Sequence, residues 1–221
     1  MLQPTRLIVV RHGRTAWNAA GRIQGQLDVP LDDVGHWQAQ QLAHALVPKA
    51  GGGQQDLTSE PALTAIYSSD LARALATAQA VADRLALHVV TDPALRERGF
   101  GRFEGLNFAE IESRWSDDAR RWRSRAPDFA PGGGESLAVF SARCVGAVLR
   151  MAAAHPGESI AVVAHGGVLD CLYRAATGLA LDAPRSWQLA NASINRLLFH
   201  GEGLVLVGWD DQAHLQAEPA A

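Results

Sequence analysis

The chain has 221 residues, of which 48% are hydrophobic, and a formal net charge of −3 at pH 7. This length suits one domain with a sizeable core, and the slight negative charge argues against binding to nucleic acid or to a membrane surface, since both favour a basic protein. Basic residues are almost all arginine, with Lys49 the only lysine, so each arginine has to be judged by its position. The apolar run near the start is too short for a signal peptide or a membrane span, and we expect a cytoplasmic protein.

The first half of the chain is predicted to alternate strands and helices. Apolar residues 7–10 predict a buried strand that ends at Arg11 and His12, and Thr15 is expected to cap a short helical turn. The remaining elements of this half are a helix from Asp32 or Asp33 that ends near Pro48, a surface loop at 51–53, a strand at 65–68, a helix capped by Ser69 or Asp70 that ends near 85, and a strand at 88–91.

The second half continues this alternation. Asn107 and Glu110 predict a capping box for a helix through Trp115 that runs on into an arginine-rich segment at 120–125. Further elements are a long helix at 136–155, a strand at 159–164, a helix from 168, and strands at 194–199 and 204–209. Apolar strands separated by helices indicate a parallel or mixed sheet covered on both faces. We predict one domain over residues 1–210 and a disordered tail over 211–221.

The two cysteines fall in segments with helical apolar patterning. We therefore expect Cys144 and Cys171 to be small buried residues rather than a disulfide or a reactive site. No spacing of residues along the chain suggests metal ligands, so no metal and no cofactor are expected.

Two predicted strands end in histidines that lie far apart in the sequence. The first strand runs into Arg11 and His12, and the strand at 159–164 runs into His165, which two glycines follow. Ligands of open α/β sheets bind at the carboxyl ends of the strands, so both histidines are expected to face one pocket. Arg11 is a permanent cation, and the glycines allow close backbone approach at the start of a helix, so this pocket suits an anion such as phosphate.

Two further side chains fit phosphate chemistry. Arg73 is predicted in the first turn of a helix after the second strand, where it can reach over the carboxyl edge of the sheet; a solvated helix arginine is the alternative. Cleavage of a phosphate ester needs an acid that protonates the leaving alkoxide, and a neutral imidazole such as that of His12 is a nucleophile. We prefer Glu97 as the acid, because Glu104 in the same glycine-rich loop can serve the loop structure.

Short motifs of this kind follow one another along nearly the whole chain. They are Arg11-His12-Gly13 with Trp17-Asn18, Gln24-Gly25, Ser69-Asp70-Leu71 with Arg73-Ala74, Leu95 with Glu97, Gly101 with Glu104-Gly105, Pro131-Gly132-Gly133 with Glu135-Ser136, and Ala164-His165-Gly166. In content and order they resemble the histidine phosphatase superfamily, in its phosphoglycerate mutase-like branch. The resemblance implies a three-layer α/β/α sandwich with a mostly parallel central sheet, and a two-step reaction through a phosphohistidine.

The resemblance also implies a role for each matching position. His12 would attack phosphorus, and Glu97 would act first as the acid and then as the base for water. Residues that would hold the phosphoryl group are Arg11, Arg73 and His165, with Asn18, Gln24 and Gly25 as further contributors to the pocket and Gly166 as a backbone donor.

The same residues serve phosphatases, which pass the phosphoryl group to water, and mutases, which return it to another hydroxyl. Mutases of this family carry a longer insertion before the second histidine and typically continue with Gly-Asn-Ser, whereas this chain is compact there and has Gly167 and Val168 after Gly166. We therefore expect a phosphomonoesterase of the histidine acid phosphatase type that acts on small phosphorylated metabolites. A phosphoglycerate mutase dependent on 2,3-bisphosphoglycerate is the alternative. A non-catalytic phospho-ligand binding protein is a weaker one, because every reacting residue is present.

Three arginines outside these motifs bear on substrate choice. Arg14 stands where the family usually has an acidic or amide residue and would add a cation at the pocket mouth, while Asp32 replaces a usual hydroxyl residue. Arg120 and Arg121 resemble a pair that binds the substrate carboxylate in mutases, although a solvated helix face explains them in an arginine-rich chain.

The segment at 108–129 is expected to select the substrate but has no decisive signature. The expected partner is a small phosphate ester, not nucleic acid or a membrane, and the sequence leaves open whether the chain forms a homodimer.

Overall fold

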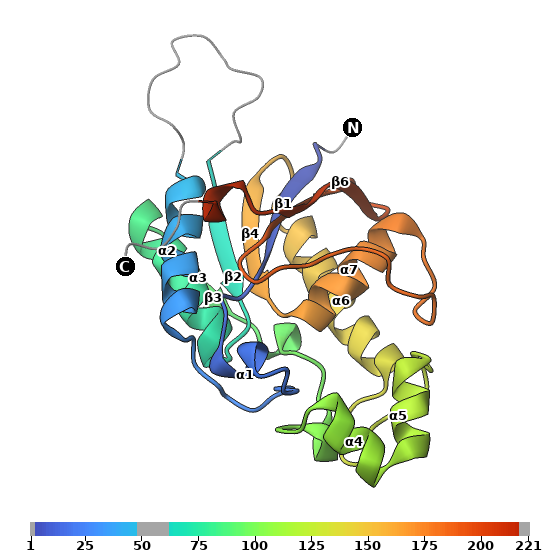
Figure 1. Cartoon of the computed structure of the whole chain (residues 1–221). Helices are drawn as coiled ribbons and strands as arrows, with labels where there is room; N and C mark the ends of the chain where they lie inside the picture. The colour runs from blue at the N-terminus through green and yellow to red at the C-terminus, as the bar shows by residue number, and fades with distance from the viewer. Residues whose placement is uncertain (1–2, 48–61, 217–221) are drawn as a thin grey trace, which may run out of the picture.

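The computed structural model describes residues 3–47 and 62–216. A six-stranded sheet in the order β3-β2-β4-β1-β5-β6 forms its centre (Figure 1). Four strands are parallel, namely β1 (Thr5–Arg11), β4 (Ser159–Ala164), β2 (Ala65–Ser68) and β3 (Val89–Thr91). The antiparallel strands β5 (Ile194–Phe199) and β6 (Leu204–Asp211) extend the sheet beyond β1. The predicted mostly parallel sheet is confirmed.

Helices cover both faces of the sheet, because side chains along a strand point alternately to opposite faces (Figure 1). In β1, Ile8 and Val10 belong to a buried cluster with residues of α2 (Asp33–Ala45) and α3 (Ala72–Leu85). Leu7 and Val9 belong to a second cluster, with residues of α6 (Leu137–Ala153) and α7 (Gly166–Thr177). This alternation confirms the three-layer architecture.

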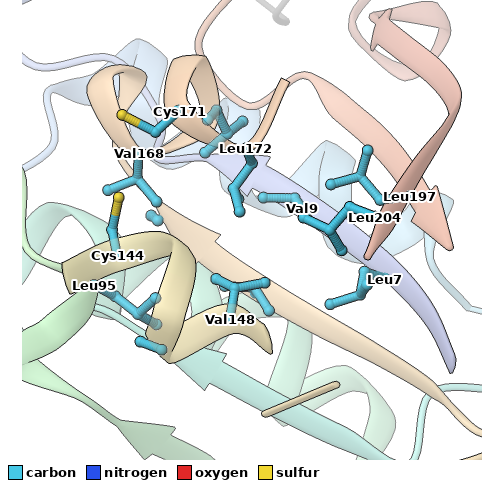
Figure 2. Close-up of a cluster of buried hydrophobic side chains, with 14 of the residues drawn as sticks. Leu7, Val9, Leu95, Cys144, Val148, Val168, Cys171, Leu172, Leu197 and Leu204 are labelled. Atoms are coloured by element: carbon cyan, nitrogen blue, oxygen red, sulfur yellow. The ribbon is translucent and has the colours of Figure 1, made fainter. Parts of the chain in front are cut away.

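The second cluster also contains both cysteines. Figure 2 shows Cys144 on α6 and Cys171 on α7 in one cluster with Leu7 and Val9 of the central strand β1. Both are buried free thiols, as predicted. The neighbouring Cys171, followed by burial, raises the pKa of the Cys144 thiol well above its usual value, since both disfavour a thiolate there.

A smaller helical unit lies between β3 and α6. It contains α4 (Phe108–Arg114) and α5 (Ser116–Arg123) and follows short 3₁₀ helices at Pro93–Leu95 and Gly101–Phe103. Asn107 and Glu110 form the predicted capping box. The prediction of one continuous helix was wrong, because the backbone leaves the helical region at Trp115 (φ −145°), whose ring stacks on Phe103 at 5.9 Å between centroids. Phe103, Ile111, Ala119 and Phe129 are buried in the core of this unit.

The start of α3 also differs from the prediction. Its N-cap position is Leu71, which supplies no side-chain bond, and the N–H of Ala72 donates instead to Asp28 Oδ1 at 2.7 Å. Ser69 and Asp70 are therefore free for other contacts. Asp70 pairs with Arg96 at 2.5 Å.

Near its end, the chain keeps regular structure beyond the predicted domain boundary. β6 extends to Asp211 and a 3₁₀ helix follows at Ala213–Leu215, where His214 Nε2 lies 3.0 Å from the carbonyl of Ala192. The tail predicted from residue 211 therefore begins too early. The predicted loop at 51–53 and residues 217–221 lie outside the described ranges. Among the helices of those ranges, none is both long and apolar enough to cross a bilayer.

Candidate active site

Three neighbouring parallel strands end with polar residues at one edge of the sheet. His12 follows β1, Ser69 lies directly after β2, and His165 follows β4. The N–H groups of His12 and Ser69 continue the sheet by donating to Ala164 and Val163 of β4. As predicted, the two histidines meet, with ring centroids 5.1 Å apart.

His12 is held as a neutral imidazole. Its Nδ1 lies 2.7 Å from the carbonyl oxygen of Gly13, and because a carbonyl only accepts, Nδ1 carries the ring proton and Nε2 keeps its lone pair. Burial, followed by the charges of Arg73 and Arg11, holds the pKa of His12 well below its usual value. A buried ring that stays neutral with a free Nε2 can act as a nucleophile at pH 7.

His165 is fully buried and faces Ser69. Its Nε2 lies 2.8 Å from Ser69 Oγ, which also accepts the N–H of Leu71 at 3.3 Å. When the Ser69 hydroxyl donates to Nε2, the imidazole carries its proton on Nδ1, an atom without a partner among the described residues. Burial, with the nearby ring of His12 and the charges of Arg73 and Arg11, lowers the pKa of His165 well below its usual value.

The guanidinium groups of buried Arg73 and half-buried Arg11 also have donors to spare. Arg73 donates to the carbonyls of Leu27 and Gly25, and Arg11 donates to Leu189, but the Nε of each arginine has no partner among the described residues. Burial lowers the pKa of both arginines, and the charge of Glu97 opposes this. The reading of Arg73 as a solvated helix residue is wrong, since it is 1% exposed. Buried donors without acceptors are unfavourable unless a ligand satisfies them.

Glu97 is fixed by backbone groups. Its Oε1 accepts the N–H of Arg98 and its Oε2 accepts the N–H of Gly167, both at 2.9 Å. A Cβ atom at position 167 would lie 2.2 Å from Oε1, so glycine makes room for this carboxylate at the start of α7. Glu104 has the other predicted role, because its Oε1 accepts the N–H groups of Gln26 and Phe100 within the loop.

The loop after His12 contains three more predicted site residues. Thr15 caps α1 (Ala16–Ala19), and Asn18 Oδ1 accepts the Thr15 N–H at 3.1 Å to complete a capping box. Gln24 is buried, and its Oε1 has no partner within the described ranges. Gly25 adopts φ +53° and offers its carbonyl to Arg73, so it positions that guanidinium. At the start of α7, a Cβ at Gly166 would lie 3.5 Å from Arg11 Nε.

The arginines predicted to select the substrate do not join this group. Arg14 donates to Asp32 at 2.8 Å, so the two residues that depart from the family pattern pair with each other. The side chain of Arg120 is 76% exposed and pairs with Asp117. The side chain of Arg121, 51% exposed, pairs with Asp128 and lies over the ring of Phe129. Both belong to a solvated face of α5.

Several residues at the site carry no motif signal in the sequence. Thr77 on α3 accepts the N–H of Gly13 at 3.0 Å, and Asn191, from the loop before β5, donates to the carbonyl of His12 at 2.9 Å. Beside Glu97 lies a pocket of about 150 Å³, lined by charged residues that include Arg125, Asp170 and Arg185. Only the fold brings these residues together. Across residues 3–47 and 62–216, no cluster of potential metal ligands is found.

Known proteins are similar to this chain along most of its length. Residues 7–212 match the model of the histidine phosphatase superfamily (branch 1). Phosphoglycerate mutase-like protein 4 of Arabidopsis thaliana is 39% identical over 213 residues, which cover 95% of this chain and 86% of that protein. Metal-independent phosphoserine phosphatase of the same species is 36% identical, with 96% and 84% covered. The crystal structure of phosphoserine phosphatase from Entamoeba histolytica in complex with 3-phosphoglyceric acid shares 28% identity and a TM-score of 0.80, and the match covers 96% of this chain and 99% of that one. The chain belongs to the histidine phosphatase superfamily.

Proposed function

We propose that the protein is a phosphomonoesterase that moves the phosphoryl group of a small phosphorylated metabolite first to His12 and then to water. The neutral, buried ring of His12 is the observation that carries this proposal. Its Nδ1 is bound to the Gly13 carbonyl, and its Nε2 makes no hydrogen bond with a described residue. The phosphatase names among the relatives point in the same direction.

The unpartnered donors around His12 support phosphoryl binding. Arg11 Nε, Arg73 Nε and His165 Nδ1 are all buried without acceptors in the described part of the chain. A phosphoryl group has several oxygens that accept such bonds, and charge that develops on them during transfer is stabilised by fixed donors in a site without bulk water. Gln24 adds an amide group, and the Gly166 N–H at the start of α7 adds a further donor.

The first chemical step forms the bond between His12 Nε2 and phosphorus and breaks the bond between phosphorus and the ester oxygen. Glu97 gives its proton to the leaving alkoxide, which departs as an alcohol. The two backbone bonds to Glu97 keep this carboxyl group in a fixed orientation beside Gly167. The bond from Nδ1 to the Gly13 carbonyl orients the ring of His12, and the bond from Asn191 holds its backbone carbonyl while the ring attacks.

The second step reverses these roles. A water molecule attacks the phosphohistidine on phosphorus and passes a proton to the carboxylate of Glu97, while the bond from phosphorus to Nε2 breaks. Inorganic phosphate leaves, His12 is again neutral and Glu97 is again protonated for the next ester. The residues supply acid, base, nucleophile and charge stabilisation, and no step calls for a metal or a cofactor.

A mutase is the second candidate, and the name of one Arabidopsis relative favours it. It would use the same phosphohistidine but return the phosphoryl group to a second hydroxyl. A non-catalytic binding protein is disfavoured, because His12, Arg11, Arg73, Glu97 and His165 are all present in the chain.

The test compares the wild-type protein with His12→Asn across a panel of phosphate esters, beside a mutase assay with phosphoglycerate and 2,3-bisphosphoglycerate. We expect hydrolysis that His12→Asn abolishes, and a phosphorylated wild-type chain after rapid quenching at alkaline pH. His88→Asn is the matched control, because His88 is exposed just before β3. Mutase turnover well above hydrolysis would replace the phosphatase assignment, and hydrolysis that survives in His12→Asn would refute the proposed nucleophile.

A further inference from the structure

Glu97, the proposed acid, lies on irregular backbone. No helix or strand includes residue 97, which stands between the 3₁₀ helices Pro93–Leu95 and Gly101–Phe103. The N–H groups of Arg98 and Gly167 orient its carboxylate, but they aim the group correctly only if the main chain that carries it stays in place. The position of Glu97 therefore depends on contacts from outside its own segment.

Arg143 on α6 supplies such contacts. Its Nη1 donates to the carbonyls of Ala94 at 2.8 Å and Arg96 at 3.1 Å, and its Nη2 donates to the carbonyl of Glu97 at 3.4 Å. Three carbonyls within four residues thus converge on one guanidinium, whose planar fork of five N–H groups suits several acceptors at once. Because α6 is anchored in the core through residues such as Phe140, this guanidinium is carried by a rigid element.

Glu135 binds the same guanidinium and also reaches the chain beyond Glu97. Its Oε1 accepts Arg143 Nε at 2.9 Å, and its Oε2 accepts Arg143 Nη2 at 2.7 Å. The same Oε2 accepts the N–H of Gly99 at 2.9 Å, and the N–H of Glu135 donates to the carbonyl of Gly99 at 2.8 Å. The ion pair therefore holds the main chain on both sides of the proposed acid.

The two charges of this pair balance each other. Burial alone would raise the pKa of Glu135, but the bonds from Arg143 and Gly99 outweigh it and hold this pKa below its usual value. Glu135 is thus ionised at neutral pH, and the bidentate contact is charge-assisted. Neither Glu135 nor Arg143 lines the pocket beside Glu97, so any effect of the pair on catalysis has to pass through the segment that it holds.

We propose that Arg143 and Glu135 are positioning residues for acid catalysis. They fix the main chain that carries Glu97 and thereby aim its carboxyl group at the leaving oxygen of the ester. This inference deepens the proposed phosphatase function and rests on it. Loss of the pair should slow the reactions that need a proton on the leaving group, and should affect other esters much less.

The test measures kcat/KM for propyl phosphate, whose leaving alkoxide needs a proton, and for p-nitrophenyl phosphate, whose leaving group does not. In Arg143→Gln we expect the ratio of propyl to p-nitrophenyl kcat/KM to fall by about 10-fold to 100-fold, the effect of a displacement of up to about 1 Å at a reacting group. Glu135→Gln should lower this ratio too. Arg143→Lys keeps the charge but not the fork, and should behave like Arg143→Gln. Arg150→Gln is the control, because Arg150 is exposed on the same helix.

Amide hydrogen exchange provides a second measurement that does not depend on turnover. The N–H groups of Arg98 and Gly167 both bond to the Glu97 carboxylate. If the pair positions this carboxylate, these two amides should exchange faster in Arg143→Gln by about 10-fold, the equivalent of one hydrogen bond. The amides of β1 should exchange as in the wild type, which shows that the core is kept.

The outcomes separate this inference from the phosphatase function. If the wild-type protein hydrolyses both esters and Arg143→Gln lowers kcat/KM for both equally, the positioning role is wrong and the phosphatase function stands. If the wild-type protein hydrolyses neither ester, the phosphatase function is wrong and exchange decides the positioning role: faster exchange at Arg98 and Gly167 supports it, and unchanged exchange overturns it. Glu135→Gln has nearly the shape of the native side chain and answers the same questions if Arg143→Gln fails to fold.

Discussion

Replacing Gly167 with alanine tests how Glu97 is held for acid catalysis. The added Cβ would lie 2.2 Å from Glu97 Oε1 and 3.1 Å from a ring carbon of Phe140, whereas ordinary contact begins at 3.4 Å. The carboxylate therefore has to move by more than about 1 Å, and its 2.9 Å bond from the Gly167 N–H is lost or stretched. A displacement of that size at a reacting group lowers the rate by about 100-fold.

The assay measures kcat/KM for an alkyl phosphate and for p-nitrophenyl phosphate. The value of kcat/KM covers the steps up to and including the first phosphoryl transfer. In that transfer, a leaving alkoxide needs a proton, whereas a leaving p-nitrophenolate does not. We expect a loss of about 100-fold for the alkyl ester and a much smaller loss for the aryl ester. Gly146→Ala is the control, because its Cβ would meet only the end of Arg150 at 3.5 Å within α6. It should leave both rates unchanged and raise stability by about 1 kcal/mol.

Two results would refute this reasoning. An equal loss of kcat/KM for both esters would mean that Gly167 serves phosphate binding rather than the acid. Unchanged rates for both would mean that Glu97 is not the proton donor or that its position does not depend on Gly167. Circular dichroism and the Tm of the variant would show whether the fold is kept.

Three further outcomes follow from buried contacts. Without phosphate, the free energy of unfolding should fall below pH 6.5 by up to about 1.4 kcal/mol per pH unit for each of His12 and His165. The pKa values of these histidines are lowered only in the folded state, so the unfolded chain binds the protons first. Urea titrations of the variant in which both histidines are changed to Gln should lose this pH dependence. Asp32→Ala should destabilise the protein by about 1 kcal/mol through the lost cap of α2, whereas Asp32→Asn should keep most of the Tm. Thr77→Val leaves the Gly13 N–H unsatisfied and should cost about 1–3 kcal/mol, with Thr77→Ser close to wild type in the same unfolding experiment.

Local signals in the sequence predict most elements of the fold correctly. The capping pairs Thr15 with Asn18 and Asn107 with Glu110 form as expected, because a cap depends on residues three positions apart. The start of α3 was missed because its first N–H group bonds to Asp28, a residue far away in the sequence. The break at Trp115 was missed for a similar reason, since its ring packs on Phe103 of another segment.

The sequence by itself determined that His12 and His165 end parallel strands and that Arg11 and Glu97 accompany them, because strand ends and short motifs are local features. Tertiary structure alone decided the states of these groups. Burial and approach from other elements keep His12 neutral, place Glu97 on the Gly167 N–H and leave one buried oxygen of Asp170 without a partner among the described residues. Charge state and unsatisfied hydrogen bonds depend on distances between segments far apart in the chain, and no local pattern encodes those distances.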